Sequence, residues 1–111
     1  MHDAPPLEDL ARRAAGAADL LRLLANERRL QILCVLRSGE RSVGELAAAV
    51  GLSPSALSQH LARLRADHLV APRRRAQTIF YRIADPDVMR LLETLAEVMD
   101  RRGSGRSEPW L

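Results

Sequence analysis

The sequence predicts a mainly helical domain that carries one small β-hairpin. Several segments place apolar residues three and four positions apart, which is the spacing of an amphipathic helix. One later stretch, residues 69–83, instead gathers β-type residues on both sides of a turn. Aromatic residues are only 3% of the chain, so the core must be built from aliphatic side chains, and 111 residues suffice for one domain with one modest core.

Two helices are expected in the first third of the chain. The first spans Leu7 to Leu24, although Gly16 weakens it by about 1 kcal/mol relative to alanine. The second follows Asn26, a suitable N-cap, and stops at Gly39. The expected apolar face of the second helix contains Leu30, Leu33, Cys34 and Leu36.

A third, short helix is predicted from Ser42 to Gly51. Ser42 and Glu45 have the spacing of a capping box, in which each side chain bonds the backbone N–H of the other residue. Glycine ends such a helix because it adopts the left-handed conformation without steric cost.

Residues 53–67 predict a fourth helix with two unlike faces. Ser53 is the expected N-cap, and Pro54 takes the first helical position, where a missing N–H costs nothing. Because an α-helix turns by about 100° per residue, Leu57, Leu61 and Leu64 share one face. The opposite face contains Ser55, Gln59, Ala62, Arg63 and Ala66, with Ser58 and His60 on its flanks.

The β-hairpin is expected to consist of two short strands, "LVAPRRR" and "QTIFYRI", joined by a turn near Arg75 and Ala76. Pro72 has no N–H to donate and therefore indicates an edge strand.

A final helix is predicted to open at Asp85 and Pro86 and to run to about Arg101. Its apolar stripe contains Val88, Leu91, Leu92, Leu95, Val98 and Met99, and the first helix adds Leu7, Leu10, Leu20 and Leu21. These stripes are broader than one small core can bury, so the sequence predicts a homodimer that forms through the first and last helices.

The basic residues are concentrated in one part of the chain. All of them are arginine, and residues 63–82 contain six arginines but one acid, Asp67. With a net charge of +3 and a sequence pI of about 10.3, this local concentration is typical of a nucleic-acid binder. The alternative is an ordinary solvated surface that is rich in arginine.

The segment "VGELAAAVGLSPSALSQHLARLR" has the form of a helix-turn-helix. A recognition helix buries one side and offers short hydrogen-bonding groups on the other, because long groups would hold it away from the groove. The predicted recognition residues are Ser55, Ser58, Gln59 and His60, with Gln59 as the main base reader, and Ser53 is a further predicted DNA contact. The predicted phosphate and hairpin contacts are Arg63, Arg73, Arg74, Arg75, Gln77 and Thr78. Strand side chains alternate, so which arginine of the hairpin faces DNA is left open.

The segments "LLRLLANERRLQILCVL", "SVGELAAAVGLSPSALSQHLARLR" and "LVAPRRRAQTIFYRI" resemble the ArsR-type (ArsR/SmtB) winged-helix repressors. Within that family the resemblance is to the NolR, HlyU and BigR branch, and it covers roughly Asp19 to Met99. It implies a winged helix-turn-helix fold and a homodimer that represses transcription at imperfect promoter palindromes. Pro54 departs from the glutamine frequent in that branch, so the operator of a relative is not carried over.

The same resemblance argues against a metal cofactor. The family's metal-ligand positions correspond here to Ser42 and Gly44, and to Asp85, Asp87, Val98 and Arg101. Serine, glycine, valine and arginine do not supply these ligand sets. We therefore expect no cofactor.

Thiol-sensing members of the branch pair a cysteine at the position of Cys34 with one near the end of the last helix, where this chain has Asp100. We expect Cys34 to be a small apolar core residue. The alternative is a single-cysteine repressor that responds to persulfides or oxidants.

The expected organisation is a flexible N-terminus (1–6), one DNA-binding and dimerisation domain (7–101) and a flexible C-terminal tail (102–111). No leader-like or membrane-spanning apolar run is present, so we expect a cytoplasmic location and no membrane partner. No nucleophile or phosphate-loop motif indicates an enzyme. The remaining alternative from another class is a winged helix that binds only proteins.

Overall fold

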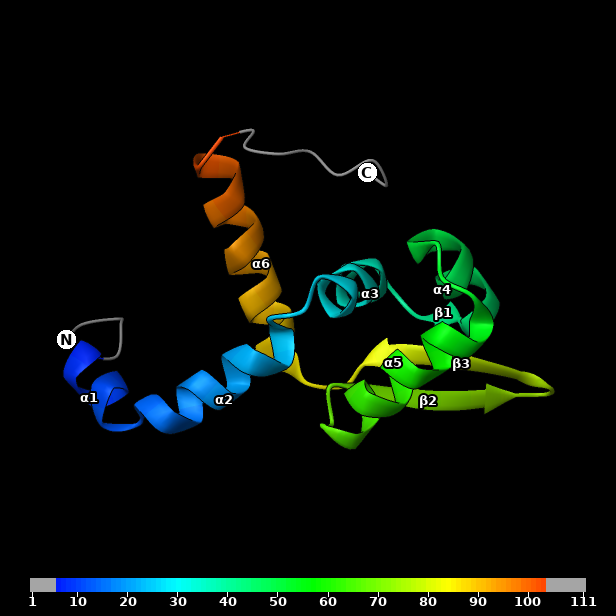
Figure 1. Ribbon diagram of the computed structural model, residues 1–111, viewed down its shortest axis with the longest axis horizontal. Helices are drawn as coiled ribbons and strands as arrows, with labels where there is room; N and C mark the ends of the chain where they lie inside the picture. Colours follow the sequence, from blue (N-terminus) through cyan, green and yellow to red (C-terminus); the bar gives the residue numbers. More distant parts are fainter. Residues whose placement is uncertain (1–5, 104–111) are drawn as a thin grey trace.

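The computed structural model describes residues 6–103, and the expectations for residues 1–5 and 104–111 lie outside this range. The described chain is mostly helical, with a small antiparallel sheet (Figure 1). In chain order the elements are α1 (Leu7–Arg12), α2 (Ala14–Leu24), α3 (Glu27–Arg37), β1 (Arg41–Ser42), α4 (Val43–Val50), α5 (Pro54–Ala66), β2 (Val70–Arg75), β3 (Thr78–Ile83) and α6 (Pro86–Arg101). This order confirms the predicted fold class.

The elements form two parts (Figure 1). Helices α3, α4 and α5 pack around the sheet, and the β2–β3 hairpin extends past them as the wing. Helices α1 and α2 extend away from this body, and α6 stands beside α3 at the same end of the molecule. Among the described residues, no helix has the length and hydropathy of a membrane span.

The prediction of one helix over residues 7–24 is wrong, because the chain breaks at Arg13. The backbone of Arg13 has φ −108° and ψ 24°, which separates α1 from α2. Its N–H donates to the carbonyl of Leu10, three residues back, instead of continuing the α-helical ladder. None of the α1 residues is buried, so no tertiary packing opposes the break.

The predicted helix starts are confirmed by their caps. The side chains of Asn26 and Ser53 each accept a hydrogen bond from the N–H three residues later, at 3.1 and 3.2 Å. Ser42 and Glu45 form the complete capping box, with bonds of 3.1 and 2.9 Å. Gly51 ends α4 with φ 69°, the left-handed conformation expected of a glycine at this point.

The sheet has the strand order β1-β3-β2, so β2 is an edge strand, as Pro72 indicates. Strand β1 was not predicted: it is two residues long and pairs Arg41 with Tyr81 across the sheet. The hairpin turns at Ala76 and Gln77, and Ala76 has φ 56°.

The connection between α5 and the wing is short and tightly bonded. His68 has φ 63°, and the N–H of the next residue, Leu69, donates to the carbonyl of Leu64 at 2.9 Å. The carbonyl of Leu69 in turn accepts from Ala84 at 2.9 Å, at the far end of the hairpin. Leu69 is itself buried, so the end of α5 and the base of the wing share the core.

The core confirms the predicted inner face of α5 and corrects that of α3. Its buried apolar residues are Leu24, Ile32, Leu33, Leu36, Leu46, Ala47, Val50, Leu57, Leu61, Leu64, Leu69, Val70, Val88 and Leu92. The prediction that Cys34 is a core residue is wrong, because this side chain is exposed. Ile32 and Gln31 are buried instead, since α3 contacts α4, α5 and β3 and is covered on more than one side.

Candidate nucleic-acid interface

The exposed face of α5 contains the short polar side chains that the sequence predicts. Ser55, Ser58 and Gln59 are exposed, and His60 is half-buried on the flank. Ser53 has a structural task, because its hydroxyl caps the helix and lies 3.4 Å from the hydroxyl of Ser55. Ser58 and Gln59 thus keep free polar groups on the surface that a DNA groove would meet.

The turn between α4 and α5 is held by hydrogen bonds from α3 and from within the motif. Arg28 on α3 donates to the carbonyl of Val50 at 2.9 Å and to the side-chain oxygen of the buried Gln31 at 3.0 Å. The N–H of Leu52 donates to the carbonyl of Ala47 at 3.1 Å. Together these bonds satisfy carbonyls at the end of α4 and fix the direction in which α5 leaves.

The wing has two distinct faces, because paired residues of adjacent strands point to the same side of a sheet. Its inner face looks toward α5 and combines Val70, Pro72 and Arg74 with Ile79, Tyr81 and Ile83. Its outer face combines Ala71, Arg73 and Arg75 with Thr78, Phe80 and Arg82. The question left open by the sequence is therefore answered in part: Arg74 lies on one face, and Arg73 and Arg75 lie on the other.

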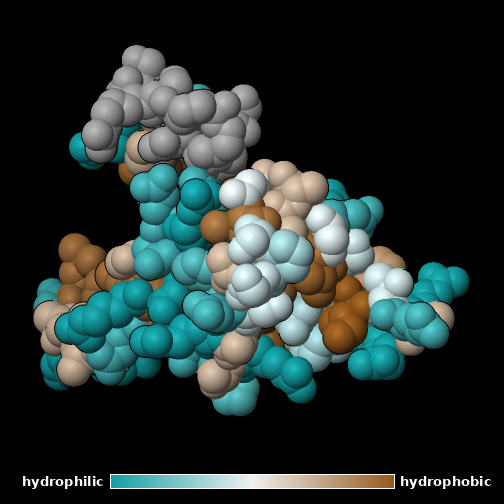
Figure 2. Space-filling model, turned by 45° about the vertical axis from the view of Figure 1, so that its right-hand side comes forward, coloured by the Kyte–Doolittle hydropathy of each residue, from teal (hydrophilic) through white to brown (hydrophobic). Residues whose placement is uncertain are grey.

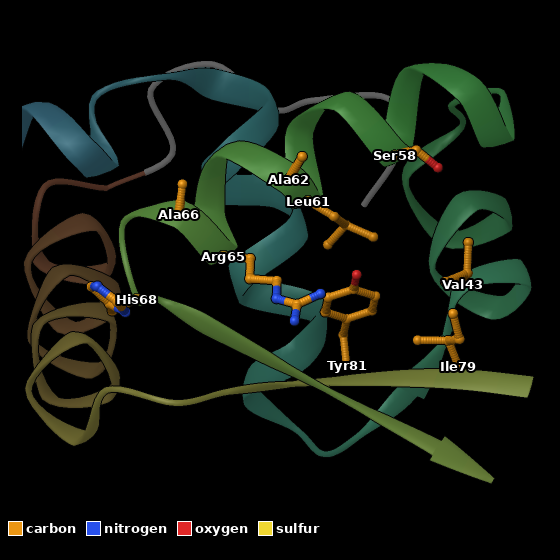
Figure 3. Close-up of a pocket in the computed structure, with 9 residues that line it drawn as sticks. All are labelled: Val43, Ser58, Leu61, Ala62, Arg65, Ala66, His68, Ile79 and Tyr81. Carbon is orange, nitrogen blue, oxygen red and sulfur yellow. The ribbon is translucent and has the colours of Figure 1, made fainter.

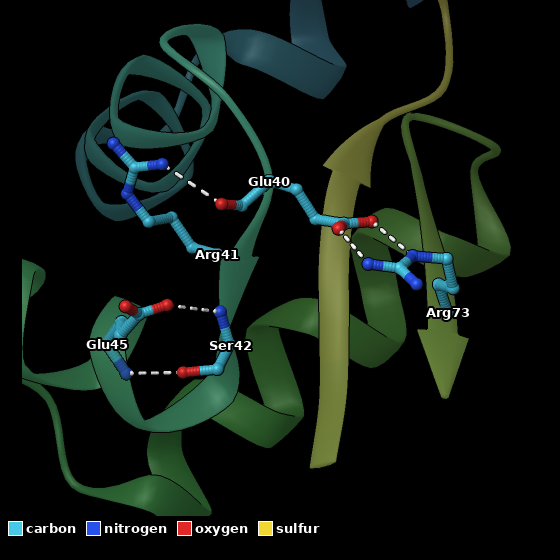
Figure 4. Close-up of polar contacts among 5 residues, drawn as sticks. All are labelled: Glu40, Arg41, Ser42, Glu45 and Arg73. Carbon is cyan, nitrogen blue, oxygen red and sulfur yellow. Dashed lines mark hydrogen bonds and ion pairs between the residues drawn. The ribbon is translucent and has the colours of Figure 1, made fainter. Parts of the chain in front are cut away.

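Arg73 is engaged by a carboxylate (Figure 4). Its Nε donates to Oε2 of Glu40 at 3.0 Å, and a second guanidinium nitrogen donates to Oε1 of the same residue. The Arg73 Cζ atom also lies 5.4 Å from the centre of the Phe80 ring. Glu40 belongs to the loop before β1, so this pair ties the wing to the body of the domain.

The Glu40–Arg73 pair is ionised at neutral pH. The hydrogen bond from Arg73 lowers the pKa of the Glu40 carboxyl, and the positive charges of Arg73, Arg82 and Arg75 add to this shift. A lowered pKa means that the pairing is fully present above the ordinary pKa of glutamate and is lost only as the pH falls through the lowered value.

The other arginines between residues 63 and 82 have no such partner. Among the residues that the structure describes, no hydrogen bond or ion pair reaches the guanidinium groups of Arg63, Arg65, Arg74, Arg75 and Arg82. By contrast, Arg12, Arg13, Arg22, Arg28, Arg29, Arg37, Arg41 and Arg90 all have one. We call the exposed face of α5 together with these five unpaired arginines the arginine surface.

A second exposed surface is apolar and lies on the helices at the other end of the molecule. Leu7, Leu10 and Leu21 are 77%, 50% and 57% exposed, and Leu95 and Met99 on α6 are also exposed. A groove of about 390 Å³ between α2, α3 and α6 is lined by Leu21, Leu24, Ala25, Leu30, Leu91, Thr94, Leu95 and Val98. Brown apolar patches break the hydrophilic surface in Figure 2, one of them at the left, where the N-terminal helices lie. We call this set of residues the leucine surface.

The exposed Cys34 has few of the features of a reactive thiol. Partial burial of the sulfur raises the pKa of the thiol, and this effect outweighs the lowering by the positive charge of Arg37. Arg37 is itself paired with Glu93 at 3.5 Å. A raised pKa leaves little thiolate at neutral pH, and the thiolate is the reactive form.

The carboxylates at the start of α6 serve the helix. Asp85 is the N-cap and accepts a hydrogen bond from the N–H of Asp87 at 2.9 Å. Within residues 6–103, no three His, Cys, Asp or Glu side chains gather in a way that could hold a metal ion.

Sequence reasoning assigned no contact at this candidate interface to four residues: Glu40, Arg65, Tyr81 and Arg82. Glu40 meets Arg73 across 33 positions of sequence, and no spacing rule predicts such a pair. Arg65 lies on α5 and Tyr81 on β3, and only the fold brings them together, in a groove between α5 and the wing.

Comparison with known proteins identifies the family. A family model described as bacterial regulatory protein, arsR family, matches residues 26–71. The transcriptional activator HlyU of Vibrio cholerae is 52% identical over 89 residues, which are 80% of this chain and 82% of that protein. The biofilm growth-associated repressor of Agrobacterium fabrum is 44% identical over 90 residues, 81% of this chain and 77% of that protein.

Solved structures agree. The crystal structure of HlyU from Vibrio vulnificus superposes with a TM-score of 0.76 at 50% identity, covering 83% of this chain and 96% of that one. The homodimeric winged helix-turn-helix DNA-binding domain of Mb0332 from Mycobacterium bovis gives a TM-score of 0.72 at 34% identity, covering 97% and 98%. The chain therefore belongs to the ArsR family of bacterial regulatory proteins and is a winged helix-turn-helix transcriptional regulator.

Proposed function

We propose that this regulator is a homodimer that binds palindromic promoter DNA and represses transcription. The observation that carries the proposal is the arginine surface: a helix face of short polar side chains together with five unpaired guanidinium groups, two on α5 and three on the two faces of the wing. Cations without carboxylate partners favour an anionic partner, and DNA presents phosphates beside base edges that serine and glutamine can read.

Each predicted contact except Ser53, whose hydroxyl caps α5, receives a role in this proposal. Gln59 bonds an adenine edge, and Ser55 and Ser58 approach the bases beside it. His60 lies at the rim of that face. Arg63, Arg74, Arg75, Gln77 and Thr78 contact phosphates, which supplies affinity without base preference. Arg73 is reassigned from a phosphate contact to a residue that positions the wing, because its guanidinium is bound to Glu40.

The leucine surface supports the homodimer. Its apolar groove and its exposed leucines need cover, and a second copy of this chain offers the same surface across a two-fold axis. The winged helix-turn-helix domain of Mb0332 from M. bovis is homodimeric. Two recognition helices held in this way would reach half-sites about one helical turn, ~34 Å, apart.

Repression is the simplest outcome for such a molecule. The relatives include an activator and a repressor. The described residues form a DNA-binding unit and the leucine surface, so the direct effect of binding a promoter is to block it. We place the protein in the cytoplasm, because the chromosomal promoters that it would bind lie there. No sensor role is proposed for Cys34, because its raised pKa disfavours the thiolate.

The proposal can be tested by selecting duplexes from a random library with the purified protein and sequencing them. We expect a palindrome with two half-sites about 10 base pairs apart, and repression of a promoter that contains it in transcription with purified polymerase. Arg74→Ala should weaken binding to selected and random duplexes alike, by about eightfold per subunit at 0.1 M salt. The absence of salt-dependent DNA binding would instead favour a module that binds only proteins.

A further inference from the structure

A groove of about 470 Å³ separates α5 from the inner face of the wing (Figure 3). Its walls are formed by Val43, Ser58, Leu61, Ala62, Arg65, Ala66, His68, Ile79 and Tyr81. Arg65 extends from α5 across the groove toward the ring of Tyr81, and the Tyr81 hydroxyl points into the same space. Nothing in the roles assigned so far uses this groove beyond Ser58.

The chemistry of the walls suits an anion. No aspartate or glutamate lines the groove, and Arg65 has no hydrogen-bonded or ion-paired partner among the residues that the structure describes. The Tyr81 hydroxyl likewise has no hydrogen-bond partner within the described chain. A guanidinium and a hydroxyl that face one space are the donors that phosphate oxygens accept.

The groove is continuous with the arginine surface. Ser58 forms part of both, because it lies on the flank of α5 between the exposed face and the wing. Arg74 lies on the same inner face of the wing, two register positions beyond Pro72, which pairs with Tyr81. The remaining walls are small and apolar, as Ala62, Ala66 and Ile79 show, and they suit the carbon surface of a deoxyribose ring.

We propose that this groove binds one phosphate of the DNA backbone with its adjoining sugar, and that Arg65 and the Tyr81 hydroxyl are its ligands. The proposal rests on the DNA-binding function proposed above and adds two contact residues to it. The backbone strand would then pass between the recognition helix and the wing, with Arg74 contacting a neighbouring phosphate.

The test compares the intact protein with Arg65→Gln, Arg65→Lys and Tyr81→Phe. Affinities for a selected duplex and for a random duplex of equal length are measured by fluorescence anisotropy across a salt series. Arg90→Gln serves as the matched control, because it removes the same charge from α6 at a side chain that is 83% exposed. Thermal unfolding of each variant shows that it is folded.

The expected results separate charge from shape. In Arg65→Gln each subunit loses one phosphate contact, so the slope of log K against log salt should become shallower by about 1.8 per dimer. Affinity at 0.1 M salt should fall by about eightfold per subunit on both duplexes. Arg65→Lys should keep the slope, and Tyr81→Phe should weaken binding a few-fold without changing the slope.

Failure of this proposal differs from failure of the proposed function. A wild-type protein that binds neither duplex overturns both. If the wild type binds with a steep salt dependence while Arg65→Gln keeps the slope of Arg90→Gln, the groove does not hold a phosphate and only the present proposal falls. An unchanged affinity in Tyr81→Phe removes the hydroxyl from the site.

Discussion

The arginine surface lacks partners for its positive charges, whereas the leucine surface lacks cover for its apolar side chains. On the arginine surface the side chains are polar or charged, and five guanidinium groups have no partner within the described chain. On the leucine surface large apolar side chains remain exposed to solvent. Arginines outside the first region, from Arg12 to Arg41, find carboxylates or carbonyls nearby. Each surface is thus incomplete by itself, and each specifies a different chemistry of partner.

The difference also separates affinity from assembly. Unpaired cations gain from a polyanion whatever its sequence, because counterions are released from each neutralised phosphate. Exposed leucines gain from an equally apolar surface, by roughly 25 cal/mol for each Å² removed from water. A change on one surface should therefore leave the property of the other measurable, except where DNA binding needs both half-sites.

The largest effect is expected from Leu95→Glu. Leu95 is 40% exposed on α6 and lines the groove of the leucine surface, so a carboxylate there would be desolvated in the dimer. We expect a monomer in sedimentation velocity and a loss of operator affinity of about 10²–10⁴-fold, because linkage of the two half-site contacts is lost. Glu97→Gln, a one-charge change at an exposed position of the same helix, should stay dimeric. A wild-type protein that sediments as a monomer at micromolar concentration contradicts this assignment.

Gln59→Ala should distinguish the residues of the arginine surface that read bases from those that contact phosphates. Gln59 is exposed near the centre of the α5 face and can bond an adenine with both its amide atoms. We expect a loss of about 1–3 kcal/mol on the selected duplex and little loss on random DNA, as measured by competition titration. Equal losses on the two duplexes would make Gln59 a phosphate contact.

A smaller effect is expected from exchanging the charges of Glu40 and Arg73. Arg73→Glu alone should weaken DNA binding several-fold, because two carboxylates then repel at the base of the wing. The double variant Glu40→Arg with Arg73→Glu keeps the net charge and restores the pair, so it should recover most of the affinity in the same titration. If Arg73 contacted a phosphate directly, the double variant would not recover affinity. A failure of rescue would therefore make Arg73 a phosphate contact.

Cys34→Ser is expected to have the smallest effect. The thiol is exposed on α3, and its pKa is raised by partial burial of the sulfur, so little thiolate is present at pH 7. Operator affinity and unfolding temperature should change little, and a persulfide donor should not release wild-type protein from DNA. Release that occurs in the wild type and disappears in Cys34→Ser would identify a single-thiol sensor.

Local chemistry explains what the sequence predicted correctly. The caps at Asn26, Ser42 and Ser53 and the left-handed end at Gly51 depend on neighbours within a few residues, so their patterns are visible in the chain. The buried face of α5 follows from helical spacing alone. The split of the polar face from the apolar face was predictable for the same reason.

The predictions that were wrong or missing depend on tertiary contacts. The break at Arg13 depends on the absence of packing against α1, and the exposure of Cys34 depends on which sides of α3 its neighbours cover. Strand β1 exists only because β3 lies beside it, and the Glu40–Arg73 pair joins residues 33 positions apart. Helical periodicity assigns one inner face to a helix, and α3 is covered on more than one side.

The left-handed residue His68 and the bonds around Leu69 have a consequence for protein engineering. Leu69 is bonded to Leu64 on one side and to Ala84 on the other, so the end of α5 and both ends of the hairpin are fixed to each other. A recognition helix grafted from a relative without this connection would not keep its native orientation relative to the wing. The segment to exchange between relatives therefore extends from Ser53 through Ala84. A chimera joined at Ala66 would separate the recognition helix from the wing that fixes its orientation.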